Sequence, residues 1–272
     1  MGRSRPGGRA VVAGAAGLLL LALAAAAAPR LTSRDPYATE LGERLRSPHA
    51  AHPLGQDTLG RDVLARMLHG ARISLAVGAA TVLVAVTTGV VLGGAAGYAG
   101  GWLDEVLVRA IDVLLAFPGL LLAIALAAVL GPSVRNVVLA LAVLGWTGYA
   151  RLARAEVAAL RRREFVQAAE ALGAGPGRII VRHLLPLAAP ALLVQATFGM
   201  AAAIVGEASL SFLGVGAPAP FPSWGAMIAE GRPVLLVAPH LTVFPGLALA
   251  LTVLALQLLG DGLRDLLDVR EQ

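Results

Sequence analysis

The 272-residue chain contains no cysteine and no lysine. Without cysteine it can form no disulfide, thiolate metal site or cysteine nucleophile. Without lysine it cannot carry the phosphate-binding loop GxxxxGKS/T, whose lysine reaches the terminal phosphates of a nucleotide. If this protein works with ATP, another chain must therefore bind the nucleotide.

Charged residues are also scarce, at 14% of the chain compared with about a quarter in soluble domains. Hydrophobic residues make up 57%, and the mean hydropathy is +0.77. This balance predicts an integral membrane protein embedded in a lipid bilayer. The formal charge of +5 comes from arginines dispersed between apolar runs, which is typical of loops that face anionic lipid and cytoplasm. Nucleic-acid binding is therefore not expected.

The first apolar run has two interpretations. Arg3, Arg5 and Arg9 precede a charge-free run of 20 residues, Ala10–Pro29. A basic start followed by an apolar stretch and small residues also describes a secretory signal peptide. Because about 20 apolar residues cross a bilayer core and signal centres are usually about 7–15 long, the length favours a retained membrane anchor.

Five further charge-free runs are long enough, or nearly so, to cross a membrane. They are residues 73–103, 113–130, 136–150, 184–206 and 241–260. The third of the six spans carries Pro118, where a kink is expected. The sequence therefore predicts an all-α integral membrane fold with six transmembrane helices, with a polar loop between the fourth and the fifth.

Six spans place both termini on one side of the membrane, and the arginines indicate which side. Residues 1–10, 151–183 and 261–272 hold 12 arginines in 55 residues. The segments on the opposite side, residues 29–72, 131–135 and 207–240, hold 9 in 83. Since cytoplasmic loops carry an excess of arginine, both termini and the loop at 151–183 are expected in the cytoplasm.

Some polar residues near the spans can have either a structural or a functional role. Residues 62–71 could form an amphipathic helix on the membrane surface. Arg109 can pair with Glu105 and Asp112 on one helical face, as an ion pair at the membrane border or as part of a pathway. Glu207 opens a loop with five prolines that can dip back among the helices, and it is a candidate pathway residue or an interfacial, hydrogen-bonded one.

The loop between the fourth and fifth spans contains a short amphipathic helix. Gly173 is placed where such a helix ends, because glycine adopts the left-handed conformation without steric cost. One face of this helix carries an apolar stripe of four residues, two of them alanine. Such a stripe buries little area, so it suits close docking into a groove on another protein better than anchoring in lipid. The alternative is that the segment is a plain connecting loop. The stripe falls at i, i+3, i+4 and i+7: Phe165, Ala168, Ala169 and Leu172.

This loop resembles the cytoplasmic coupling loop, or EAA loop, of permease subunits of ABC importers. Gln167-Ala168-Ala169, Gly173 and Leu185-Pro186 keep the spacing of that motif. Gln167 replaces the usual glutamate, and His183 replaces an isoleucine. The resemblance implies that an ATPase subunit docks here, on the residues Gln167, Ala168, Ala169, Glu170, Gly173, Leu185 and Pro186.

Two more segments resemble the C-type permease subunits of dipeptide, oligopeptide and nickel importers. They are the stretch from His52 to Asp62 and the loop that begins at Glu207, and the likeness extends from His52 to about Arg270. It divides the chain into an N-terminal anchor with an extracytoplasmic segment, residues 1–72, and a permease core with five transmembrane helices, residues 73–272.

The resemblance also implies the partners and the mechanism. A second, similar permease completes the pathway, two ATP-binding subunits dock on the coupling loops, and an extracytoplasmic binding protein delivers the substrate. ATP binding brings the ATPases together and tilts the helices, so that the pathway opens alternately to each side. The chain itself has no catalytic residue, metal site or cofactor in this interpretation, and its cargo is a dipeptide, a longer peptide, nickel or a sugar.

Two other classes of membrane protein fit this sequence less well than a permease does. A secondary transporter needs coupling-ion chemistry and usually internal repeats, whereas polar groups in these spans are few. An intramembrane hydrolase needs a nucleophile and a base, but Ser74 and His69 have no partner motif. His49, His52 and His69 also lack the spacing of a metal site.

Overall fold

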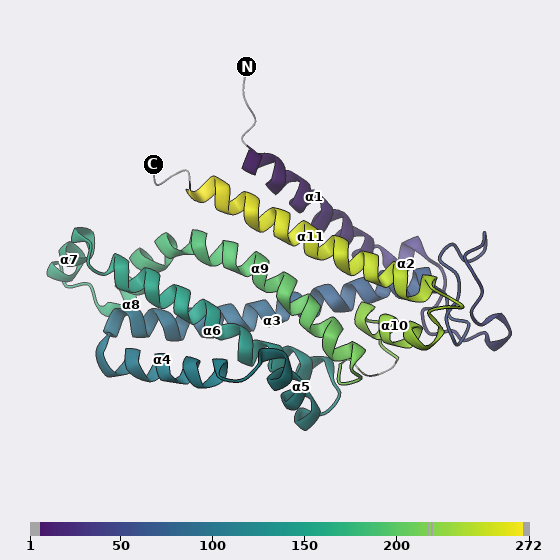
Figure 1. Cartoon of the computed structure of the whole chain (residues 1–272). Helices are drawn as coiled ribbons and strands as arrows, with labels where there is room; N and C mark the ends of the chain where they lie inside the picture. The colour runs from purple at the N-terminus through teal and green to yellow at the C-terminus, as the bar shows by residue number, and fades with distance from the viewer. Residues whose placement is uncertain (1–5, 217, 219, 269–272) are drawn as a thin grey trace, which may run out of the picture.

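The computed structural model of the chain is a bundle of long helices (Figure 1), and it describes residues 6–216, 218 and 220–268. Across these ranges the regular structure is helical, and two isolated β-bridges, His49 with His52 and Gln56 with Asp62, lie outside the helices. The predicted all-α class is therefore confirmed.

Five of the described helices are long and apolar enough to cross a membrane, and a bent pair makes a sixth if it counts as one span. The five are α1 (Pro6–Ala26), α3 (Val63–Ala99), α6 (Val134–Leu160), α9 (Leu185–Phe212) and α11 (His240–Asp268). The bent pair is α4 (Gly101–Leu115) with α5 (Gly119–Leu130). Short elements complete the described chain: α2 (Ala28–Leu31), η1 (Leu41–Glu43), α7 (Glu164–Ala171), α8 (Pro176–Ile179), η2 (Ile180–Leu184), α10 (Trp224–Gly231) and η3 (Arg232–Val234).

The first helix packs against the last. α1 runs beside α11, and a side chain at Gly14 would meet the backbone of Ala255 and Leu259 at 2.6 Å. The predicted membrane anchor thus has a close packing partner within the same chain. Its retention in the membrane stays a prediction.

The second span differs from the sequence prediction. Residues 62–71 do not form a separate surface helix, because α3 runs without a break from Val63 to Ala99. The side chain of Asp62 caps its first turn by accepting a hydrogen bond from the Ala65 N–H at 2.7 Å. At about 1.5 Å per residue this helix of 37 residues is about 55 Å long, well beyond a bilayer core of about 30 Å. The predicted boundary between residues 72 and 73 falls inside it.

The third span is broken rather than kinked. α4 and α5 meet at 86° just before Pro118, since the residue before a proline is disfavoured in helical conformation. α4 packs through Leu107 and Ile111, and its side chains Glu105, Arg109 and Asp112 are exposed. The predicted ion pair forms there, with 2.5 Å between Arg109 Nη2 and Glu105 Oε1.

The backbones of α3 and α6 touch. Gly89, Gly93 and Gly97 recur every four residues, so they lie on one face of α3. A side chain at Gly89 would lie 2.6 Å from the Trp146 carbonyl oxygen, and side chains at Gly93 and Gly97 would collide with the backbone of Ala150 and Arg154. Glycine is therefore required along this seam because any Cβ would push the two helices apart.

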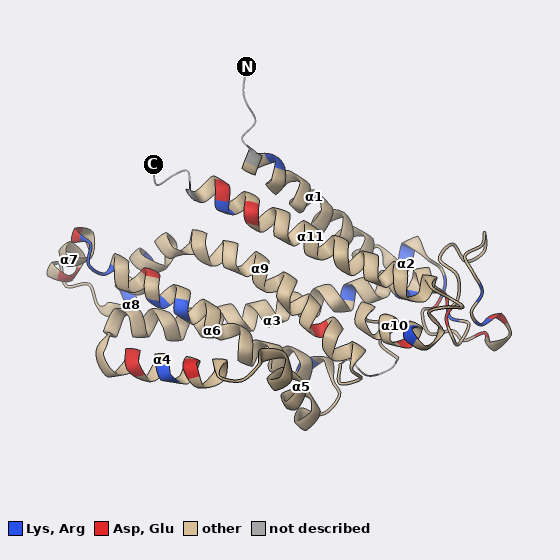
Figure 2. Cartoon of the chain, in the orientation of Figure 1, with Lys and Arg blue, Asp and Glu red and all other residues tan. Residues whose placement is uncertain are grey.

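Charged residues gather toward the two ends of the bundle and along α4 (Figure 2). One end, called here the coupling end, carries α7, α8 and the C-terminal turns of α3 and α6. The opposite end, the loop end, carries residues 32–62 and α10. Such a distribution fits a protein whose middle third is surrounded by lipid.

The glycine seam generates a prediction with a neighbouring control. Gly93→Ala should destabilise the bundle by about 1–3 kcal/mol, the usual cost of overpacking. Gly94→Ala should be neutral or slightly stabilising, because its Cβ would meet Ile180 and Leu185 at 3.9 and 4.0 Å, an ordinary contact distance. Both changes replace glycine by alanine in the same helix, so helix propensity cancels. Equal melting temperatures of the two variants in detergent would contradict the seam.

Candidate functional site

The loop between α6 and α9 folds into a compact helical turn at the coupling end. α7 follows α6 directly after Arg161–Arg163, and α8 then leads into α9. Gly173 ends α7 with φ +82°. Its N–H donates to the Glu170 carbonyl at 2.9 Å and the Ala174 N–H donates to the Ala169 carbonyl at 3.0 Å. These two bonds make a Schellman motif, which requires the left-handed residue that the sequence predicts at Gly173.

The apolar residues of α7 are divided between two faces. Val166 is fully buried with Val157, Ile179 and Leu184, and Ala169 packs beside them. Phe165 and Leu172, by contrast, are 41% and 89% exposed, and Ala168 is exposed as well. The predicted stripe is thus open to solvent at Phe165, Ala168 and Leu172, while Ala169 belongs to the chain's own core.

Polar contacts tie α7 to the end of α3. The Tyr98 hydroxyl donates to Glu170 Oε1 at 2.9 Å. The Arg161 guanidinium lies 4.7 Å above the Tyr98 ring and donates to the Tyr98 carbonyl oxygen. Glu170 therefore faces the body of the chain. The sequence reasoning missed Tyr98, because it lies 72 residues from Glu170 and belongs to no motif.

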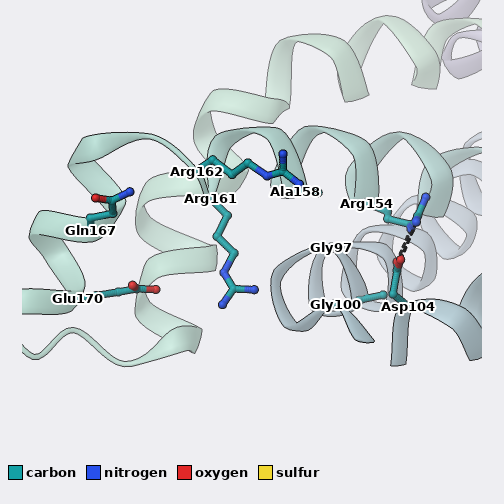
Figure 3. Close-up of a pocket in the computed structure, with 10 residues that line it drawn as sticks. Gly97, Gly100, Asp104, Arg154, Ala158, Arg161, Arg162, Gln167 and Glu170 are labelled. Carbon is teal, nitrogen blue, oxygen red and sulfur yellow. Dashed lines mark hydrogen bonds and ion pairs between the residues drawn. The ribbon is translucent and has the colours of Figure 1, made fainter. Parts of the chain in front are cut away.

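Figure 3 shows a cavity of about 590 Å³ between α7 and the ends of α3 and α6. Arg154 Nη2 donates to Asp104 Oδ2 at 2.6 Å at one side of it. Arg154 of α6 thus pairs with Asp104 of α4, a contact that the sequence alone does not indicate. Gln167 and Glu170 approach from α7, opposite Arg161 and Arg162 of the α6 end. With three arginines and two carboxylates in its lining, the cavity suits an acidic or polar group of a partner protein.

Leu185 and Pro186 lie inside a continuous helix rather than at its start. Residues Pro176–Phe212 form one span of 37 residues, with a π turn at Ile180–Leu184. In that turn the Leu185 N–H bonds to the Ile180 carbonyl, five residues back. The wider turn precedes Pro186, which has no N–H to continue the ordinary ladder. His183 lies half-buried in this turn.

Comparisons with known proteins can now be set beside this geometry. Residues 89–271 match the family described as "Binding-protein-dependent transport system inner membrane component". The dipeptide transport system permease protein of Alkalihalophilus pseudofirmus is 46% identical over 241 residues, which cover 89% of this chain and 79% of the relative. The chain belongs to this family.

Two further relatives agree with this assignment. The glutathione transport system permease protein of Pectobacterium atrosepticum is 46% identical over 94% of this chain and 86% of its own length. The protein of the same name from Shigella sonnei is 48% identical over 81% of this chain and 73% of its own length. The chain is thus a permease subunit of an ABC importer, an inner-membrane protein with several spans, and not an enzyme. Nothing in these similarities favours a secondary transporter.

Glu207, the candidate pathway residue of this permease, is buried within the chain. Its carboxylate accepts a hydrogen bond from the Ser211 hydroxyl at 2.7 Å and a longer one from the Ser74 hydroxyl at 3.4 Å. The Trp224 N–H reaches the same Ser74 hydroxyl at 3.4 Å. Glu207 therefore joins α9 to α3 and α10. Its place in a transport pathway stays a prediction.

A buried charge network organises the loop end of the permease. Asp57 Oδ2 accepts a hydrogen bond from Arg61 Nε at 2.6 Å and another from Arg66. Both arginines also reach Glu230 Oε2, 2.6 Å from each. This network joins the loop before α3 to α10, more than 160 residues later in the chain. Sequence reasoning missed it, because no spacing rule links Glu230 to the earlier stretch.

His52 belongs to the same end and is structural. It is buried, and its Nδ1 lies 2.7 Å from Asp62 Oδ2. In the described part of the chain, no group of three or more His, Asp or Glu side chains is placed to hold a metal ion.

The charge network generates a stability prediction. Asp57→Asn leaves two buried arginine side chains with Glu230 as the remaining carboxylate partner, so it should cost up to about 3–5 kcal/mol of folding free energy, the usual effect of breaking a buried pair. Glu43→Gln is the control, since its ion pair with Arg46 is exposed and should be worth at most about 1 kcal/mol. Thermal unfolding in detergent measures both. A similar small loss for both variants would show that the network is not important for stability.

Proposed function

We propose that this permease carries di- or oligopeptides across the cytoplasmic membrane, as part of an ATP-driven importer. Support comes from two relatives, whose names specify dipeptide and glutathione, both small peptides. The segments at His52–Asp62 and after Glu207 resemble C-type permeases of dipeptide, oligopeptide and nickel importers, which is compatible with this cargo. The observation that carries the proposal is the high identity to the dipeptide permease over 89% of this chain.

The proposed complex contains this chain, a second homologous permease, two ATP-binding subunits and an extracytoplasmic substrate-binding protein. The chain has no lysine for a phosphate-binding loop, so the nucleotide must be bound by other subunits. The exposed face of α7 offers the docking surface for one of them. Apolar side chains as exposed as Phe165 and Leu172 on a short helix are typical of a contact site.

We place the coupling end, and with it both chain termini, in the cytoplasm. The arginine excess in residues 1–10, 151–183 and 261–272 supports this orientation. The loop end then faces the binding protein that delivers the cargo.

The contacts around α7 suggest how movement of an ATPase reaches the membrane. Val166 fixes α7 to the core at the α6 and α9 ends, and Glu170 fixes it to α3 through Tyr98. Displacement of α7 therefore displaces the ends of three long helices together. Because these helices are continuous through the membrane, they tilt as levers instead of bending locally.

Gly173 tests the coupling role. Gly173→Val forces a β-branched residue into φ +82°, at a cost of about 1–2 kcal/mol, and should weaken ATPase docking roughly tenfold. Gly175→Val is the matched control, because Gly175 has φ −71° and open space around its Cβ. Peptide uptake in cells and co-purification of the ATPase are measured at equal expression. Wild-type uptake by Gly173→Val would leave this loop as a plain connector.

The orientation can be tested by labelling, because the chain has no cysteine. Cysteines placed at Ala51 and Leu236 of the loop end should react with an impermeant thiol reagent added to intact cells. Cysteine at Gly175 should react only after the membrane is opened. All three sites are exposed, so lack of reaction reports the membrane barrier and not burial. Labelling of the Gly175→Cys variant from outside would reverse the orientation and exclude the coupling role.

A further inference from the structure

A second cavity, of about 290 Å³, lies within the membrane bundle, away from the coupling loop. α3 runs behind α6 and α9 in Figure 1, and all three helices line the cavity. Most of its surface is aliphatic or glycine, and no charged side chain contributes. Three uncharged polar side chains do: Thr81, Tyr149 and Gln195.

Thr81, like Thr242 of α11, has a buried hydroxyl that lacks a hydrogen-bond partner in the described part of the chain. It lies midway along α3, only 3% exposed, and its hydroxyl has no hydrogen-bond partner among the described residues. Thr87 and Thr252 instead donate to carbonyls of their own helices at 2.8 and 2.7 Å. A buried hydroxyl is rarely left unpaired, because its desolvation is then uncompensated. The oxygen is itself covered in this structure, so it can pair with a group that enters the neighbouring cavity only when the surrounding side chains move apart.

The other two polar groups have spare capacity as well. The Tyr149 hydroxyl makes only a long contact, 3.5 Å, with the Gln195 carbonyl oxygen. The side-chain amide of Gln195 has no partner in the described residues and is half-exposed at the cavity. A primary amide in contact with lipid tails would leave its donors and acceptor unsatisfied. This face of α9 is therefore built for contact with water, protein or cargo.

The rim of the cavity supports the same conclusion. Gly145 of α6 and Ala202 of α9 are exposed there, so a facing group can approach the helices closely. The opposite side of α9 is different, since Leu193 is 61% exposed two residues from Gln195. One helix thus presents a lipid-like face and a polar, small-residue face.

We propose that this cavity is part of the transport pathway and that Thr81, Tyr149 and Gln195 bind peptide-bond groups of the passing cargo. The inference rests on the proposed function. Hydroxyl and amide groups complement the N–H and C=O of a peptide bond, and the uncharged lining offers nothing to a free metal ion. The volume is at the lower end of the roughly 300–1,000 Å³ of ligand pockets. Because the cavity is open on one side, the second permease supplies the remaining wall.

The first test uses the assembled transporter in proteoliposomes, with saturating peptide-loaded binding protein. Thr81→Val preserves the shape of the side chain and removes the hydroxyl, and Gln195→Leu removes the amide. Each should lower the number of peptides transported per ATP hydrolysed by about three- to tenfold, the value of about one lost hydrogen bond. Thr87→Val, on the same helix with its hydroxyl exposed and internally bonded, should match the unaltered transporter.

The second test reads water access and occupancy directly. Gln195→Cys should react with a charged methanethiosulfonate reagent in the assembled transporter, and peptide-loaded binding protein should slow this reaction at least threefold during turnover. Leu193→Cys should stay unreactive, because it faces lipid. Equal rates at the two positions, or no protection at 195, would show an acyl-chain groove or a closed packing defect and would overturn the inference.

Different results contradict the proposed function and the proposed role of the cavity. If the unaltered transporter takes up no peptide, the proposed function is wrong whatever the cysteines report. If it takes up peptide and Thr81→Val and Gln195→Leu transport as it does, only the assignment of this cavity is wrong.

Discussion

The backbone contact between α3 and α6 is the constraint on which the rest of the structure depends. Gly89, Gly93 and Gly97 allow the two helices to lie closer together than they could with side chains at these positions. Their C-terminal ends therefore meet, and Arg154 of α6 can reach Asp104 at the start of α4. Without a hydrophobic force between helices in lipid, such close packing must supply the attraction.

The same contact positions α7. Because α3 ends beside α6, the Tyr98 hydroxyl can donate a hydrogen bond to Glu170, and the Arg161 guanidinium can lie over the Tyr98 ring. α7 is then held from two sides, by this polar contact and by Val166 in the core below it. One face of α7 is therefore fixed to the bundle, whereas its other face, with Leu172, is exposed.

Local features of the fold were predictable from the sequence, and contacts between distant segments were not. Long charge-free runs located the helices, and Gly173 marked the end of α7, since both depend on neighbouring residues alone. The 86° break before Pro118 exceeds what a proline alone indicates. Ala169 was predicted to belong to the docking stripe, whereas it packs against the core of the same chain. Helical spacing alone cannot show which residues of a narrow apolar stripe are covered by the rest of the chain. The Asp57–Arg66–Glu230 network joins segments that only the tertiary fold brings together.

The distribution of polar groups limits what this subunit can select. Ion pairs hold the two ends, at Asp104 with Arg154 and at Asp57 with Arg61. Between them the cavity at Thr81 offers only uncharged groups, because an unpaired charge at this depth would cost far more than a hydroxyl. Uncharged groups recognise the peptide backbone, which all peptides share, and not the charge of a side chain. In the proposed pathway, discrimination among peptides must then come from the delivering protein or the second permease, and this subunit contributes a passage of broad tolerance.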